Sequence, residues 1–162
     1  LGLLPCRRTA FRVESPGAEA SSWAMVADVD LNFYVKPDGY QLLCSLGEEK
    51  PSDPCDARPE EADVALAIDR INSATTLGIR VVKAAWTGLR TFTTDRSMVI
   101  GPEPGCSSFV WCVGQGGTGI MTSPGVGRLV ADLVTNGEPS GVLDGSEFRL
   151  EEILPDRFRG CS

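Results

Sequence analysis

The chain has 162 residues, of which 42% are hydrophobic and 23% are charged, so it has enough apolar side chains to bury the core of about one domain. Its formal net charge is −7, and no run of Lys or Arg is long enough to follow a phosphate backbone, which argues against a nucleic-acid partner. The sequence contains no histidine. This excludes His-dependent nucleophile pairs, His-ligated metals and the commonest general base.

The cysteines and the apolar runs indicate the environment of the protein. None of the six cysteines stands in a C-x-x-C pair, so we expect neither a zinc site nor any other metal. Cys44 and Cys112 lie in apolar runs, as small buried thiols do, and reduced cysteines in a cytoplasmic protein are therefore expected over disulfides. No apolar stretch approaches the roughly 20 residues that span a bilayer, so membrane association is not expected. The chain begins with Leu1 rather than Met, which suggests that sequence is missing upstream.

Residues 11–45 have the pattern of an antiparallel sheet. Two runs that favour β-structure, Val29–Val35 and Tyr40–Ser45, flank Lys36-Pro37-Asp38-Gly39. Proline presets φ for the second position of a turn and glycine accepts a positive φ, so this segment predicts a hairpin. The polar residues 46–58 predict a surface loop.

A helix is predicted over Pro59–Thr76. Proline suits the first helical position, and the acidic residues that follow it lie at the positive end of the helix dipole. Gly78 is expected to stop this helix, and Ile79–Ala85 predicts a strand. Apolar residues recur at helical spacing along one side of the helix: Val64, Ala67, Ile68, Ile71 and Ala74.

The most informative stretch is Phe109–Gly137. Phe109–Val113 is a short continuous apolar run, which predicts a strand buried on both faces. It leads directly into the glycine-rich segment Gly114–Gly119, and apolar residues at helical spacing then continue to Asn136-Gly137, a good helix stop. A strand, glycine loop and helix in this order present bare backbone N–H groups to an electron-rich group. The residues from Glu138 onward predict a surface loop with a short arm, and we assign them no role.

Two segments are candidates for the functional site, and each alone is ambiguous. The glycine loop equally fits a tight turn that needs glycine for close packing. Its spacing is not G-x-G-x-x-G, and no Lys follows it, so it is neither a dinucleotide fingerprint nor a P-loop. The segment Trp86–Arg96 contains Arg90, which by itself fits a surface arginine paired with Asp95.

Together and in this order, the two segments resemble the D-amino-acid oxidase superfamily of FAD enzymes, which includes the glycine and sarcosine oxidases. In these enzymes a W-x-G-x-R segment precedes a glycine loop of the form G-H/Q-G-G-x-G-I/L. Within the superfamily the pattern is most similar to that of the bacterial D-arginine dehydrogenases. The resemblance covers roughly residues 3 to 135, and its further matching segments are Arg7–Phe11, Phe33–Asp38, Ala74–Leu77 and Gln115–Ile120.

The resemblance implies a set of site residues. Arg90 would bind the α-carboxylate of an amino acid, and Arg8 and Tyr34 would bind the carboxylate or the polar atoms next to it. A guanidinium matches a carboxylate with two parallel hydrogen bonds, and a phenol adds a donor without a competing charge. No residue is implied as a catalytic acid or base. The residues that would line the flavin are Gly116, Gly117, Thr118, Gly119, Ile120 and Met121.

The implied activity is FAD-dependent oxidative deamination of D-amino acids. A hydride would pass from the substrate α-carbon to flavin N5, and the imino acid would then hydrolyse to a 2-oxo acid and ammonia. Thr118 and Met121 stand where the D-arginine dehydrogenases have Tyr and Gln, so a preference for D-arginine is not carried over. The alternatives are a glycine- or sarcosine-type amine oxidase and a non-catalytic truncated remnant.

The implied fold is α+β and corresponds to the C-terminal portion of a two-domain FAD-binding oxidoreductase. Residues 1–95 would form a substrate-binding domain with an antiparallel sheet, residues 96–137 the last strand, loop and helix of the FAD-binding domain, and residues 138–162 a tail. The N-terminal Rossmann segment that holds the FAD pyrophosphate is absent, so we expect an inactive fragment whose partner is that missing half. Apolar surface around Phe109–Val113 should then be exposed, with poor solubility as a consequence.

Overall fold

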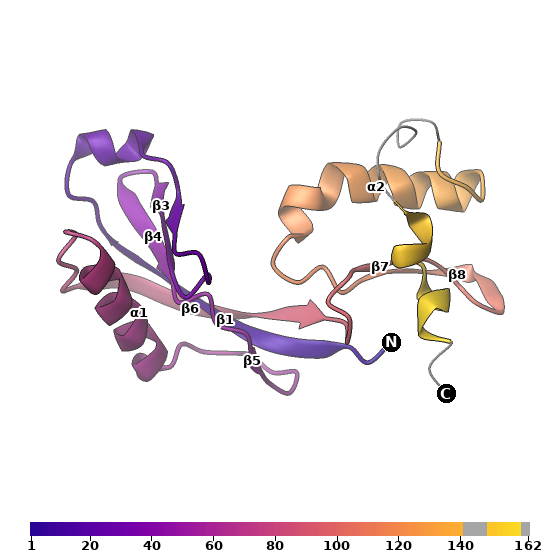
Figure 1. The fold of residues 1–162 in the computed structure, drawn as a ribbon, viewed down its shortest axis with the longest axis horizontal. Helices are drawn as coiled ribbons and strands as arrows, with labels where there is room; N and C mark the ends of the chain where they lie inside the picture. Colours follow the sequence, from indigo (N-terminus) through magenta and orange to yellow (C-terminus); the bar gives the residue numbers. More distant parts are fainter. Residues whose placement is uncertain (141–148, 160–162) are drawn as a thin grey trace. The chain divides into compact units, whose positions relative to one another are not determined.

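The computed structural model describes residues 1–140 and 149–159, which have a mixed α/β fold with antiparallel sheets and two α-helices (Figure 1). This confirms the mixed α/β class and the antiparallel sheet predicted from the sequence. The chain forms two compact units. One unit is Cys6–Leu89, and the other combines Leu1–Pro5 with the chain from Arg90 onward.

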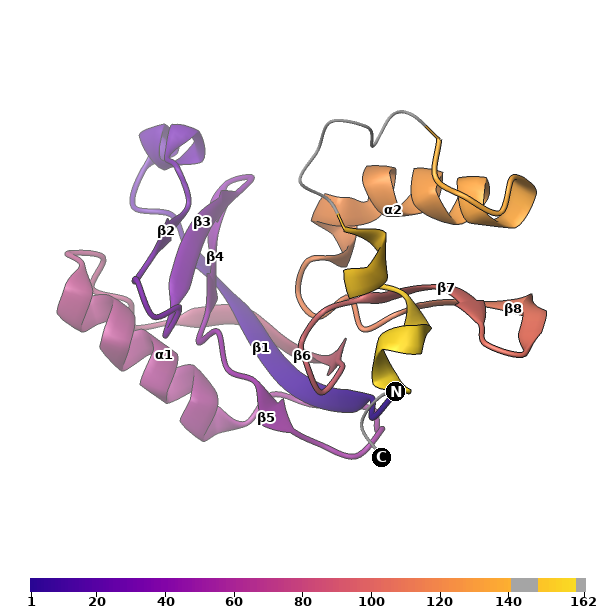
Figure 2. The ribbon, with the colours of Figure 1, turned by 45° about the vertical axis from the view of Figure 1, so that its right-hand side comes forward.

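The unit Cys6–Leu89 is built on a six-stranded sheet with the order β2-β3-β4-β1-β5, in which β6 also pairs with β1 (Figure 2). The strand β6 overlaps the stretch Ile79–Ala85 that was predicted as a strand after the helix, but it begins only at Val82 and continues to Phe92. Trp86 and Arg90 therefore lie on a strand. A short 3-10 helix, Ala18–Ser22, precedes β2. The strands are β1 (Leu4–Glu14), β2 (Val26–Ala27), β3 (Tyr34–Asp38), β4 (Gln41–Ser45), β5 (Lys50–Pro51) and β6 (Val82–Phe92).

The predicted hairpin is confirmed as β3 and β4, with its turn two residues later than expected. Asp38 pairs with Gln41, so the turn residues are Gly39 and Tyr40. Gly39 has φ +64°, a left-handed conformation that glycine adopts at little cost. Pro37 lies in the strand rather than in the turn.

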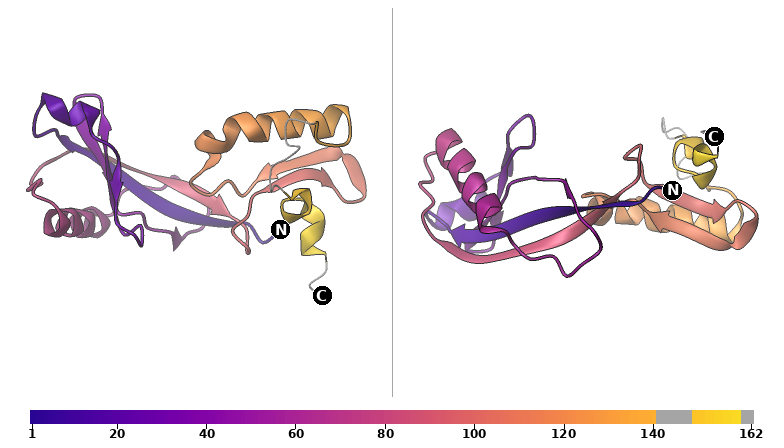
Figure 3. Two further views of the ribbon diagram at one scale, coloured as in Figure 1. Left: turned by 45° about the horizontal axis from the view of Figure 1, so that its top comes forward. Right: turned by 90° about the horizontal axis from the view of Figure 1, so that it is seen from below.

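The helix α1 (Glu61–Ala74) confirms the second predicted element and lies along one face of this sheet (Figures 1 and 3). Burial of the apolar stripe on α1 against the strands stabilises the unit, because apolar area is removed from water. Cys44 is fully buried in this core, and burial raises the pKa of its thiol to about 12. Residues central to the core are Phe11, Val13, Val35, Leu42, Cys44, Ala67 and Ile71.

The second unit contains the antiparallel pair β7 (Val99–Glu103) and β8 (Cys106–Val113), followed by α2 (Gly119–Thr135), which runs beside the pair (Figure 3). Pro124 lies inside α2 and has no N–H to donate to the carbonyl of Ile120. The Ser123 hydroxyl donates to that carbonyl instead, at 2.8 Å. The helix ends before Asn136 and Gly137, as predicted, and Gly137 has φ +80°.

The strand β8 corrects one expectation and confirms another. It pairs only with β7 among the described residues, and none of its residues is buried, so it is not buried on both faces. Phe109 is 49% exposed, and the thiol of Cys112, predicted to be buried, is exposed. Apolar surface at this strand is therefore exposed, as predicted.

The C-terminal residues differ from the predicted surface loop. Leu150–Glu152 and Pro155–Phe158 form two 3-10 helices, η2 and η3, and η3 packs on β7. The N–H of Ile100 donates to the carbonyl of Ile153 at 2.9 Å. Pro155 is buried.

Two findings bear on the environment of the protein. Cys6, Cys44, Cys55, Cys106 and Cys112 are free thiols, whereas Cys161 lies outside the described residues. Within the described ranges, neither α-helix combines the length and the apolar character that a membrane span requires.

Candidate functional site

The glycine loop between β8 and α2 is built against the end of β6. The N–H of Gly116 donates to the carbonyl of Thr91 at 2.9 Å. Gly116 has φ +56°, and a Cβ at this position would lie 2.7 Å from Cε1 of Phe92. Both the conformation and the close approach therefore require glycine. The loop thus contacts β6 one residue beyond Arg90.

The start of α2 presents unpaired backbone donors. Among the residues that the structure describes, the N–H groups of Gly117, Gly119, Ile120 and Met121 have no acceptor. The Thr118 N–H donates to the Gln115 carbonyl at 3.0 Å, and the next bonded amide is that of Thr122, to the Thr118 carbonyl at 3.0 Å. Ile120 is 93% exposed and Met121 is 76% exposed. Free amides at the positive end of a helix, beside exposed apolar side chains, suit a flat group that carries negative charge on its edge.

Gln115 adds an unpaired acceptor to the loop. Its Oε1 atom is buried and has no hydrogen-bond partner within residues 1–140 and 149–159, whereas its Nε2 donates to Cys112 Sγ at 3.5 Å. A buried polar atom without a partner is costly in a folded protein. The loop therefore offers several donors and one acceptor in a small area, and these groups fit the edge of a flavin ring.

Arg90 is half-buried on β6, and its side chain has no hydrogen bond or ion pair in the described part of the chain. Asp95, the partner suggested by sequence proximity, instead binds Arg157, with 2.6 Å between Nε and Oδ2. That hydrogen bond holds the pKa of Asp95 well below its usual range. The interpretation of Arg90 as a surface arginine paired with Asp95 is therefore wrong. A half-buried arginine whose side chain has no anionic partner among the described residues, and which directly precedes the residue bonded to the glycine loop, is available to bind a carboxylate.

Arg8 and Tyr34 lie on one face of the other unit's sheet. Tyr34 is directly opposite Ser45, and Ser45 is directly opposite Ala10. Residues opposite one another in antiparallel strands share a face, and Arg8 is two residues from Ala10 on β1. This face is the reverse of the one that α1 covers, because the side chains of Phe11 and its neighbours in the core point the other way.

Arg8 is already held by two groups. Its Nε donates to the carbonyl of Glu48 at 2.7 Å, and its Nη2 lies 3.0 Å from Oε1 of Glu49. A carboxylate ligand at Arg8 must therefore share the guanidinium with Glu49. Sequence reasoning missed both partners because they come from the segment before β5, about which the local pattern indicates only polarity.

A stacked pair on the same sheet face was also missed. The guanidinium of Arg12 lies 5.4 Å from the centre of the Trp86 ring, and its Nε lies 2.6 Å from Oδ2 of Asp38. The W-x-G-x-R motif identified Trp86 without indicating that Arg12 covers it. Alternation along β6 places Arg90 on the same side of the strand as Trp86.

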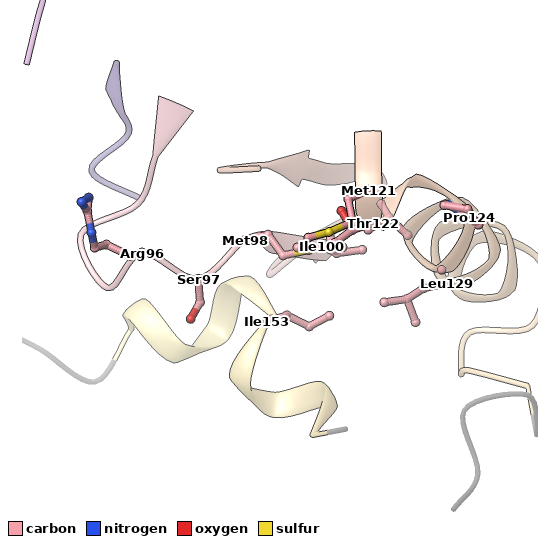
Figure 4. A pocket seen from close by; sticks show the side chains of 11 residues that line it. Arg96, Ser97, Met98, Ile100, Met121, Thr122, Pro124, Leu129 and Ile153 are labelled. Atoms are coloured by element: carbon pink, nitrogen blue, oxygen red, sulfur yellow. The ribbon is translucent and has the colours of Figure 1, made fainter. Parts of the chain in front are cut away.

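An apolar groove of about 550 Å³ lies in the second unit (Figure 4). Met121 and Thr122 contribute to its wall, so the groove reaches the end of the glycine loop. Of the described residues that line it, Arg96 alone is charged, and it lies at the end away from α2 (Figure 4). No group of three or more His, Cys, Asp or Glu side chains suited to a metal occurs among the described residues.

Comparison with known proteins identifies the family. A family model described as FAD dependent oxidoreductase matches residues 1–133. The chain belongs to this family. Its cofactor is FAD, with which the donors of the glycine loop are consistent.

The curated relatives are considerably longer than the chain. FAD-dependent oxidoreductase domain-containing protein 1 of Mus musculus is 29% identical over 134 residues, and the protein of the same name from Bos taurus is 33% identical over 135 residues. Each match covers 76% of the chain and 26% of the relative. The chain therefore spans about a quarter of the length of these relatives.

Solved structures show the same fold. The L-proline dehydrogenase from P. horikoshii superimposes with a TM-score of 0.77 at 21% identity, covering 97% of the chain and 40% of that protein. The iminodiacetate oxidase from Chelativorans sp. BNC1 gives 0.74 at 20% identity, covering 95% and 40%. The glycine oxidase from Geobacillus kaustophilus gives 0.73 at 22% identity, covering 95% and 39%.

Proposed function

We propose that the chain forms the substrate-binding and flavin-contacting part of an enzyme that oxidatively deaminates D-amino acids, giving an imino acid and then a 2-oxo acid and ammonia. The observation that carries this proposal is the half-buried Arg90, which lacks a partner among the described residues and stands one residue from the hydrogen bond between Thr91 and Gly116. An unpartnered arginine that adjoins, along the strand, the residue bonded to a loop with free amides suits an anionic substrate held next to an electron-accepting ring.

In this proposal Arg90 binds the α-carboxylate through both arms of its guanidinium. Tyr34 donates a hydrogen bond to the carboxylate or to a neighbouring polar atom, and Arg8 contributes the donors that Glu49 leaves free. If the substrate binds with a neutral amine, no protein base is needed to remove a proton from it, which suits a chain without histidine. These side chains orient the α-carbon and its hydrogen.

The flavin is held by the loop and the start of α2. When bound, it accepts a hydride from the substrate α-carbon. The free N–H groups of the loop donate hydrogen bonds to its edge, and the helix dipole favours the negative charge that develops there. Ile120 and Met121 cover its apolar surface. The residues proposed to contact it are Gly116, Gly117, Thr118, Gly119, Ile120 and Met121.

We also propose that a dinucleotide-binding segment of the same gene product completes the enzyme. The relatives are about four times as long as the matched part, and β8 has an unpaired edge and exposed apolar side chains among the described residues. An uncovered strand edge and an apolar groove are unfavourable in water, and another strand and helix would remove both from solvent. Five free thiols among the described residues are consistent with a cytoplasmic protein, which we propose as its location.

A glycine- or secondary-amine oxidase is the second candidate. Proteins with the same fold include glycine oxidases and an iminodiacetate oxidase, as their names state. The Arg7-Arg8 segment and Tyr34 favour the D-amino acid assignment, as does the similarity of several motifs to those of the D-arginine dehydrogenases. In the first candidate the substrate carries a side chain on its α-carbon. In the second it has no side chain, as in glycine, or carries a substituent on its nitrogen.

The test is anaerobic reduction of the flavin in the complete gene product. We expect loss of flavin absorbance with D-amino acids, and weaker loss with glycine or sarcosine. Preferential bleaching by glycine, sarcosine or iminodiacetate favours the second candidate. A flavin that no D-amino acid or N-methyl amino acid reduces contradicts both.

A further inference from the structure

We propose that Arg157 is a positioning residue for the flavin loop: it holds the turn Thr93–Ser97, and this turn supports Gly114 and Gly116. The inference rests on the proposed function in that it assigns the loop to the flavin. It gives a role to the C-terminal residues 149–159, which lie beyond the family match at residues 1–133.

The side chain of Arg157 is largely buried and forms hydrogen bonds with several groups. Its side chain is 13% exposed, and its Nε and Nη2 lie 2.6 and 3.2 Å from the two carboxylate oxygens of Asp95. Nη2 also donates to the carbonyl of Ser97 at 2.8 Å, and Nη1 to that of Leu154 at 3.1 Å. The guanidinium stacks on the Phe158 ring at 4.3 Å. One side chain thus joins η3 to the centre of a short turn, at Asp95, and to its C-terminal end, at Ser97.

The turn held by Arg157 has a conformation that needs support. Arg96, at its tip, has φ +64°, which is uncommon for a residue other than glycine and costs free energy. Asp95 accepts hydrogen bonds from the Thr93 hydroxyl at 2.8 Å and from the Ser97 N–H at 3.0 Å. Thr93 is buried. Asp95 is therefore the centre of the turn, and Arg157 fixes its carboxylate in place.

The glycine loop packs directly on this turn. A Cβ at Gly114 would lie 2.8 Å from Cγ2 of Thr93 and 3.6 Å from Cα of Met98, so Gly114 is in contact with the segment. Gly116 packs against the Phe92 ring, over which the Arg96 guanidinium lies at 4.6 Å. Both left-handed glycines of the loop therefore rest on residues whose positions depend on the turn.

The contacts of η2 and η3 allow the role of Arg157 to be separated from that of the segment as a whole. The hydrogen bond between Ile100 and Ile153, and the packing of Leu154 on Gly101, attach the segment to β7 independently of Arg157. Arg159 provides a matched control on the same segment. It lies 3.3 Å from Glu103 and donates to the carbonyl of Pro104 at 2.6 Å, and among the described residues it forms no hydrogen bond or ion pair with the turn.

The experiment compares Arg157→Ala, Arg157→Lys and Arg159→Ala in the complete gene product. Hydrogen exchange of the Ser97 and Gly116 amides is measured without FAD, and the FAD dissociation constant and the circular dichroism of the bound flavin are measured with it. Loss of the charged hydrogen bonds in Arg157→Ala should speed exchange at both amides, and weaken FAD binding, by roughly tenfold or more. Arg157→Lys should restore part of the protection, and Arg159→Ala should match the wild type.

Exchange at Gly116 that is unchanged in Arg157→Ala overturns the proposal, as does an equal effect of Arg159→Ala. Faster exchange with an unchanged FAD dissociation constant and an unchanged flavin dichroism spectrum overturns the link to the cofactor. If Arg157→Ala does not fold, Arg157→Lys decides by the same measurements. A wild-type protein that binds no FAD contradicts the proposed function, whereas the exchange data still decide whether Arg157 supports the loop.

Discussion

Substitution of Gly116 by Ala tests whether the glycine loop has the geometry that the site requires. The new methyl group would lie 2.7 Å from Cε1 and 3.2 Å from Cδ1 of Phe92, a side chain that is 8% exposed. The ring cannot move away freely, because Arg96 stacks on it. Gly116 also has φ +56°, which an alanine adopts only at a cost.

The expected loss of stability is the sum of a backbone conformational cost and a packing cost. A left-handed conformation costs an L-residue about 1–2 kcal/mol, and an extra methyl group in a packed site about 1–3 kcal/mol. The sum is about 2–5 kcal/mol, and about 4–8 °C of melting temperature is lost per kcal/mol in a domain of this size. We therefore expect the melting temperature of the unit to fall by about 8 °C or more.

Thermal unfolding followed by circular dichroism is the assay, with Gly125→Ala as the matched control. Gly125 lies in α2, and a Cβ there meets no atom within 4 Å. Since alanine is the better helix former, this variant should be as stable as the wild type or gain up to about 1 kcal/mol. If Gly116→Ala and Gly125→Ala melt alike, the close packing of the loop on β6 is refuted.

Three further predictions concern the binding site, the core and the turn. Arg90→Ala should lower kcat/KM for an amino acid by about 10- to 150-fold, because a charge-assisted hydrogen bond worth about 1.5–3 kcal/mol is lost. The melting temperature should stay close to that of the wild type, because no carboxylate loses its partner. A decrease in kcat/KM of less than threefold contradicts the assignment. Ile71→Ala, at a fully buried position, should destabilise the chain by about 2–5 kcal/mol in chemical denaturation, and the half-exposed Leu66→Ala on the same helix should cost far less; equal losses mean that α1 packs by another face. The hydrogen bond from Arg157 lowers the pKa of Asp95, so the stability that Asp95 adds is fully present above the ordinary carboxyl pKa of about 4 and is lost as the pH falls below it through the folded-state pKa. Melting of the wild type and of Asp95→Asn should therefore differ at pH 7 and converge at low pH, and a difference that grows on acidification contradicts this sign.

The elements that the sequence predicted well are those whose signals are local. The hairpin follows from glycine at a position that needs a positive φ, and the helices follow from apolar residues at a spacing of three and four. The glycine loop was recognised because a strand pattern, glycines and a helix pattern follow one another directly. The turn of the β3–β4 hairpin nevertheless lies two residues later than expected. Pro37 is tolerated in β3 because it lies beyond the last residue of β3 that pairs with β2.

What the sequence did not predict depends on contacts between distant residues. The apolar run in β8 has the composition of a doubly buried strand, but composition does not say whether neighbouring strands are present. Asp95 was a reasonable partner for Arg90 by proximity, whereas its observed partner Arg157 is 62 positions away. The two short 3-10 helices have no periodic pattern, so the sequence did not predict the packing of η3 on β7.

The central claim is that the guanidinium of Arg90 binds a carboxylate next to a flavin held by the glycine loop. The most direct test is a titration of the oxidised, FAD-loaded complete gene product with a carboxylic acid that has no α-hydrogen to transfer, followed through the flavin absorbance spectrum. We predict a saturable spectral change in the wild type and a dissociation constant at least about tenfold higher in Arg90→Ala. Equal dissociation constants for the two proteins, or a flavin spectrum that the carboxylate leaves unchanged, would contradict the account.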